Sequence, residues 1–96
     1  MTNTPPYAAR MSIDTIDHQN APILTGSSNV IINNYGAARV TDQITRHLPG
    51  GPHELSYINS GSSTVEINGL PAARVDDTTT CDGNIVTGSM TVIIGG

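Results

Sequence analysis

Residues 26–39, GSSNVIINNYGAAR, and residues 61–74, GSSTVEINGLPAAR, are two copies of one 14-residue unit. The copies agree at the opening Gly-Ser-Ser, at alternating Val and Ile positions, and at the closing Ala-Ala-Arg. A third copy is split between the chain ends, because residues 88–96, GSMTVIIGG, match the start of the unit and residues 6–10, PYAAR, match its end. Repeated sequences of this kind fold into similar supersecondary units. We therefore expect three equal units, with the two chain ends side by side.

Each unit predicts a β-hairpin. β-Branched residues recur at every second position, a period typical of a strand; they are Val30 and Ile32, Val65 and Ile67, and Val92 and Ile94. Turn-forming pairs follow them, namely Asn33-Asn34, Asn68-Gly69 and Gly95-Gly96. The small Ala pairs that come next suit strands that converge tightly. The expected fold is all-β: a small repeat of three hairpins around a pseudo-three-fold axis.

The composition limits the core and excludes several classes of protein. The 96 residues are enough for one domain, spanning 1–96, and they include no Phe and no Trp. The core must therefore be aliphatic, and a domain of this size often needs an additional staple. The net charge of −4 argues against nucleic-acid binding. We expect no membrane span and no signal peptide, because no long apolar run is present.

The histidines and the cysteine predict a metal staple at one apex of the fold. They number only four, and Cys81 has no second cysteine for a disulfide. Counted back from the Gly that opens each unit, His18, His53 and Cys81 take nearly the same place in three connecting segments, and the longer middle segment adds His47. Three imidazoles and one thiolate form a tetrahedral zinc set with no open position, which indicates a structural site. Iron or another divalent ion is the alternative metal.

Arginine also repeats, at the end of every unit. Arg10, Arg39 and Arg74 are each followed by acidic residues, which are Asp14, Asp42, and Asp76 or Asp77. One interpretation is a solvated charge at each hairpin end. The other, which we favour, is a bidentate ion pair that ties neighbouring units together in a structural role.

The closing tetrapeptide carries a family resemblance. It reads Pro71-Ala72-Ala73-Arg74 in one unit, with the variants Gly36-Ala37-Ala38-Arg39 and Tyr7-Ala8-Ala9-Arg10 in the others. With the recurrent Gly-Ser-x-x-Val-x-Ile strands, the chain resembles the PAAR-repeat proteins over nearly its whole length. These proteins form the tip of type VI secretion spikes and of related contractile phage tails. The resemblance implies a cone with zinc near its vertex, held here by His18, His47, His53 and Cys81.

The resemblance also implies a partner and a mechanical function. One chain would cap a trimeric β-helical spike protein, VgrG in secretion systems or the central spike in phages, and sharpen it for membrane piercing. Its base would extend the trimer by β-augmentation, and the candidate contact residues are Val30, Ile32, Val65, Ile67, Val92 and Ile94. We expect assembly in the cytoplasm and delivery outside the cell with the machine, or a place in a virion tail, with transient contact to the target membrane.

Three other functions stay open. The chain is alternatively an adaptor that recruits separate effectors to the spike, or a metal-storage module. The enzymatic alternative is a small thiol hydrolase that uses Cys81 with His47 or His53. No oxyanion-hole signature and no third orienting group accompany that pair, so we expect no catalytic activity. We also expect no fused effector domain.

Overall fold

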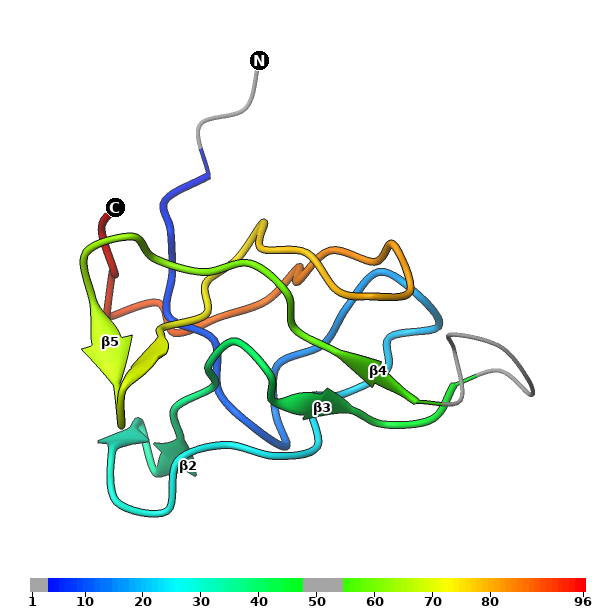
Figure 1. Cartoon of the computed structure of the whole chain (residues 1–96), viewed down its shortest axis with the longest axis horizontal. Helices are drawn as coiled ribbons and strands as arrows, with labels where there is room; N and C mark the ends of the chain where they lie inside the picture. The colour runs from blue at the N-terminus through cyan, green and yellow to red at the C-terminus, as the bar shows by residue number, and fades with distance from the viewer. Residues whose placement is uncertain (1–3, 48–54) are drawn as a thin grey trace.

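The computed structural model describes residues 4–47 and 55–96 (Figure 1). Its regular elements are short β-strands: β1 (Ile31–Ile32), β2 (Tyr35–Gly36), β3 (Gln43–Ile44), β4 (Ser56–Tyr57), β5 (Glu66–Ile67) and β6 (Leu70–Pro71). They pair into three antiparallel two-stranded sheets, β1–β2, β3–β4 and β5–β6. The predicted all-β class is confirmed. In the described ranges, no helix has the length and apolar character needed to cross a membrane.

The repeat hairpins form as predicted. In β1–β2 the turn residues Asn33 and Asn34 have φ angles of 50° and 75°, and in β5–β6 Asn68 and Gly69 have 55° and 79°. Two successive positive φ angles define the hairpin turn that matches strand twist, and Asn and Gly adopt them most readily.

The third hairpin joins the two chain ends. Tyr7 forms a bridge with Ile93, and the N–H of Ile94 donates to the carbonyl oxygen of Pro6 at 3.0 Å. The first and last described segments therefore run side by side, at the end of the molecule that also carries the other two hairpins (Figure 1). The prediction that the split unit is completed in space is confirmed.

The Ala-Ala-Arg segments meet in a closed ring around the pseudo-three-fold axis. The N–H of Ala9 donates to the oxygen of Ala73 at 3.0 Å, that of Ala73 to Ala38 at 3.0 Å, and that of Ala38 to Ala9 at 2.9 Å. All six alanines of the three pairs are buried. The space between the three backbones accommodates a methyl group and no larger side chain. This explains why Ala recurs where the backbones approach one another.

The repeated Gly-Ser has a local cause. A Cβ atom at Gly61 would lie 2.8 Å from the carbonyl oxygen of Ala72, closer than real Cβ atoms approach, and Gly26 and Gly88 face equivalent carbonyls. The hydroxyl of Ser62 then accepts hydrogen bonds from the backbone N–H groups of Thr64 and Val65, at 3.1 and 2.9 Å. The first residue thus allows close packing of the hairpins, and the second satisfies the backbone that enters the strand.

Two apolar clusters lie along the chain's pseudo-axis. The hairpin cluster contains Ile32, Ile67 and Ile94 with one alanine of each pair, and Val30 and Val92 pack against its edge. Val65, a further candidate contact residue, is 36% exposed. The loop cluster holds the other alanines and Cys81, together with Ile16, Ile23, Ile44, Ile58 and Ile85. The hairpin cluster supports the base, and the loop cluster supports the opposite end.

Each repeated arginine forms a bidentate ion pair. Nε and Nη2 of Arg39 donate to Oδ2 and Oδ1 of Asp42, at 2.9 and 3.1 Å, and this pairing raises the pKa of Arg39. Arg10 pairs with Asp14 in the same way, and Arg74 pairs with Asp77 rather than Asp76. The carboxylate therefore closes a turn just after its own arginine. Nη1 of Arg39 reaches the next unit, where it donates to Oδ1 of Asn68 at 3.0 Å.

Candidate metal centre

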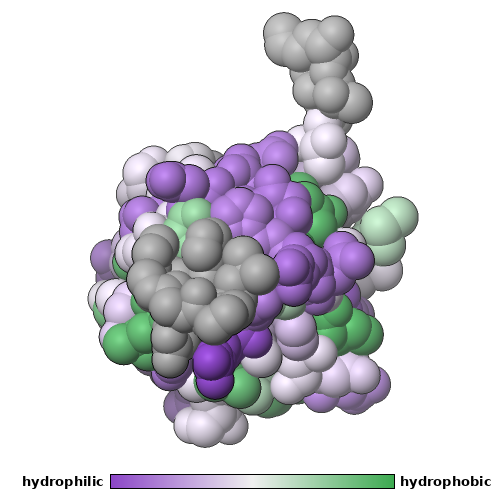
Figure 2. Space-filling model, turned by 90° about the vertical axis from the view of Figure 1, so that its right-hand side faces the viewer, coloured by the Kyte–Doolittle hydropathy of each residue, from purple (hydrophilic) through white to green (hydrophobic). Residues whose placement is uncertain are grey.

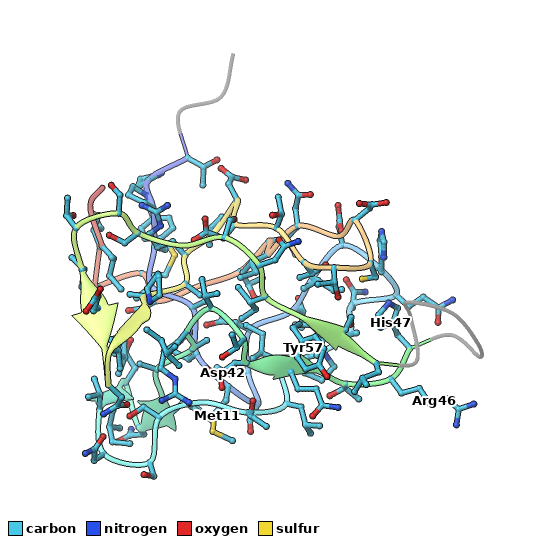
Figure 3. The ribbon with its side chains drawn as sticks, in the orientation of Figure 1. Met11, Asp42, Arg46, His47 and Tyr57 are labelled. Carbon is cyan, nitrogen blue, oxygen red and sulfur yellow. The ribbon has the colours of Figure 1, made fainter. Side chains whose placement is uncertain are left out.

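The three connecting segments lie side by side because they pair with one another in a cycle. Three β-bridges, Ile16 to Ile85, Ile23 to Ile44 and Ile58 to Thr79, link each segment to the next. All six side chains are at most 1% exposed. The alanine ring lies on one side of this layer. On the other side, at the end opposite the repeat hairpins, lies His47 (Figure 3).

Three of the four predicted ligands converge at this end of the molecule. The donor atoms of His18, His47 and Cys81 lie within 4.8 Å of one another. Sγ of Cys81 is 3.5 Å from Nδ1 of His18 and 3.6 Å from Nε2 of His47. Bond lengths of about 2.3 Å to sulfur and about 2.0–2.1 Å to nitrogen, at a tetrahedral angle, separate the two donors by about 3.5 Å. The donor set therefore fits a tetrahedral metal ion.

The surroundings orient His47 for coordination. Its Nδ1 lies 3.0 Å from the carbonyl oxygen of Thr45. A carbonyl only accepts, so Nδ1 carries the proton and Nε2 presents its lone pair toward Cys81. Metal-binding histidines generally have such a partner on the second nitrogen. The neighbouring Arg46 points away from the cluster into solvent (Figure 3).

Burial differs among the three groups. Cys81 is buried and belongs to the loop cluster, whereas both histidines are partly exposed and their rings lie 5.7 Å apart. Figure 2 looks onto this end of the molecule and shows hydrophilic residues over much of its middle, with apolar residues toward its sides. A bound ion would therefore rest on the apolar layer that contains Cys81, with the two histidines on its more exposed side.

The sequence predicted the ligands of this cluster, and the structure describes three of the four. His53 lies outside the described residues, so its role as a ligand stays a prediction. Counting from the strand that leads into each turn, His18 and Cys81 come two residues after Ile16 and Thr79, and His47 comes three after Ile44. This equivalence places His47 with the other two, whereas the sequence count treated it as an addition.

Sequence reasoning missed Thr79. Its hydroxyl oxygen lies 3.2 Å from Sγ of Cys81, and the residue is buried. Thr79 occupies the position that Ile16 and Ile44 hold in the other segments. The sequence does not reveal this equivalence, because the connecting segments differ in length and only the β-bridges align them.

The fold and the cluster define a small all-β repeat protein whose three connecting segments bring together side chains that could hold a metal ion. A family model for the PAAR motif matches residues 14–87. The chain belongs to this family. A search of the curated proteins finds no match. Family membership supports, in general terms, a spike-tip function of the type VI secretion or phage-tail kind, and the motif is generally associated with spike proteins such as VgrG.

Proposed function

We propose that the chain is a non-catalytic tip that caps a trimeric β-helical spike, with a zinc-locked vertex at one end and a hairpin base at the other. The observation that carries this proposal is the placement of the metal donors. They come from three pseudo-equivalent connecting segments and meet with sulfur–nitrogen separations of 3.5 and 3.6 Å, at the end opposite the three repeat hairpins.

Zinc is the proposed metal, and His18, His47, His53 and Cys81 are its proposed ligands. Four protein ligands give a closed structural site, whose binding free energy contributes directly to folding of the vertex. A vertex held by metal–ligand bonds resists deformation just beyond the apolar layer that supports it. This rigidity suits an element that transmits force from a contracting sheath to a membrane.

The hairpin end is the proposed seat on the spike. A pseudo-three-fold base matches the symmetry of a trimer, and its strands offer backbone groups for β-augmentation. The isoleucines Ile32, Ile67 and Ile94 are 6–9% exposed, while Ile31 and Ile93 on the same hairpins are 56% and 59% exposed. Covering these side chains would add apolar burial to the backbone pairing.

Metal stoichiometry tests the vertex. Elemental mass spectrometry on the purified protein should find one zinc per chain, and the content should fall in Cys81→Ala. Val86→Ala serves as a matched control, because Val86 is 44% exposed and belongs to no cluster of the core. A folded wild-type protein without metal would refute the zinc-locked vertex.

Binding to a purified spike trimer tests the base. Ile31→Asp should weaken the complex at least about tenfold, which corresponds to about 1.4 kcal/mol, because it places a charge against the covered surface. Val86→Asp adds the same charge outside the hairpins and should leave binding unchanged. Equal binding by wild type and Ile31→Asp would show that the hairpin end is not the seat.

A further inference from the structure

The core layer beneath the candidate metal centre breaks the three-fold pattern at one position. Ile16, Ile44 and Thr79 are equivalent, because each pairs with the returning isoleucine of a neighbouring segment. All three are at most 1% exposed. The hydroxyl therefore replaces an alkyl group in an otherwise apolar layer, and it does so in the segment that carries the cysteine. A buried hydroxyl is unfavourable unless it is hydrogen-bonded, so its partners show what it contributes.

The hydroxyl of Thr79 has three polar neighbours. The N–H of Gly83 donates to it at 3.0 Å, and the oxygen of Gly83 and Sγ of Cys81 each lie 3.2 Å away. A hydroxyl has one proton to give. The oxygen of Gly83 already accepts the backbone N–H of Thr79 at 2.9 Å. A thiolate is the stronger acceptor of the two, because hydrogen bonds to ionised groups are roughly twice as strong as neutral ones. When Cys81 binds a metal as a thiolate, the hydroxyl of Thr79 therefore donates its proton to Sγ of Cys81.

Glycine at position 83 keeps this arrangement accessible. A Cβ there would lie 3.1 Å from the hydroxyl oxygen of Thr79 and 3.1 Å from Cδ1 of Ile16. Thr79 and Ile16 are themselves 1% and 0% exposed, so neither neighbour has open space to move into. The backbone therefore approaches the hydroxyl closely enough to hold it in one orientation, with its proton free to face Cys81.

We propose that Thr79 is a positioning residue for the metal ligand Cys81. Its hydroxyl donates to the metal-bound thiolate and fixes the direction in which Sγ faces His18 and His47. This inference rests on the proposed metal function of the vertex. Partners of this kind, one shell outside the ligands, typically change metal affinity 10–100-fold.

The test compares hydroxyl deletion with hydroxyl retention. Thr79→Val keeps the branched shape and removes the hydroxyl, Thr79→Ser keeps the hydroxyl, and Ile44→Val trims the equivalent position in another segment. Cobalt(II) is titrated into each metal-free protein in competition with a chelator, and the sulfur-to-cobalt charge-transfer absorption is recorded. We expect Thr79→Val to bind cobalt about 10–100-fold more weakly and its absorption to shift to lower energy. Loss of a hydrogen bond raises the energy of the sulfur lone pair, which accounts for the shift.

The serine variant and Ile44→Val should keep both the affinity and the band position of the wild type. Thr79→Val also removes the acceptor of the Gly83 N–H, so urea unfolding of the metal-free proteins is measured in parallel. An affinity loss without a band shift, or an equal loss in Ile44→Val, would assign the effect to packing and overturn the inference. Wild-type protein that binds no cobalt would overturn the proposed vertex as well. Normal wild-type binding with an unchanged Thr79→Val would overturn only the role of Thr79.

Discussion

Replacing Ile58 by alanine is expected to lower the free energy of unfolding by about 3 kcal/mol. Ile58 is 1% exposed and lies in the loop cluster that supports the candidate metal centre. The substitution removes three carbon groups, each of which contributes about 0.8 kcal/mol when buried. A residual cavity adds to this loss, and isoleucine-to-alanine changes in cores generally cost about 2–5 kcal/mol.

Because of the pseudo-symmetry, the same prediction applies to two further residues. Ile23 and Ile85 occupy the same place in the other two segments, and both are fully buried. Ile23→Ala and Ile85→Ala should therefore also cost about 2–5 kcal/mol, the range of such changes in cores. For a domain of this size, 3 kcal/mol corresponds to a fall in Tm of about 12–24 °C.

Urea unfolding followed by circular dichroism, with zinc in excess, measures the three losses. Ile93→Ala is the matched control, because Ile93 is 59% exposed, and it should change stability by less than about 0.5 kcal/mol. If one of the three buried variants were as stable as the control, the equivalent layer deduced from the β-bridges would be wrong.

Three further predictions concern polar groups. Cys81→Ser should lower the Tm of the zinc-loaded protein while leaving the base strands formed and the Tm of the chelated protein nearly unchanged; an unchanged Tm with zinc would contradict a structural site. Asp42→Asn should cost about 2–4 kcal/mol in urea unfolding, because the buried carboxylate accepts charge-assisted bonds from Arg39 and a further bond from Thr25; a loss below 1 kcal/mol would show that solvent replaces them. Ser56→Ala should be neutral or stabilising by about 1 kcal/mol, because the buried hydroxyl has no partner within the described part of the chain. A marked loss of stability in that variant would reveal a partner.

The hairpins could be predicted from sequence because their determinants are local. Alternation at Val65 and Ile67 defines a strand, and Asn68-Gly69 defines the turn that reverses it. The split unit could also be recognised, since matching halves at the two ends must meet to complete a hairpin. The candidate metal ligands could be named from the sequence, because the chain has only three histidines and one cysteine.

The choice between Asp76 and Asp77 required the structure. Both follow Arg74 closely, and the backbone settles the matter because Asp76 takes a left-handed φ of 77° while Asp77 turns back toward the guanidinium. Similarly, six alternating Val and Ile residues looked equivalent in sequence. Only packing separates the three buried isoleucines from the more exposed Val65.

Local sequence therefore decided the repeating units, their turns and the candidate ligands, because period, turn chemistry and residue type act over a few neighbouring residues. Tertiary structure decided which residues become equivalent between segments of unequal length. The bridges Ile16 to Ile85, Ile23 to Ile44 and Ile58 to Thr79 set that alignment across the chain. They place His47 beside Cys81 and a hydroxyl against its sulfur. Such contacts depend on how three loops pack around a common axis, and no spacing along the chain encodes that directly.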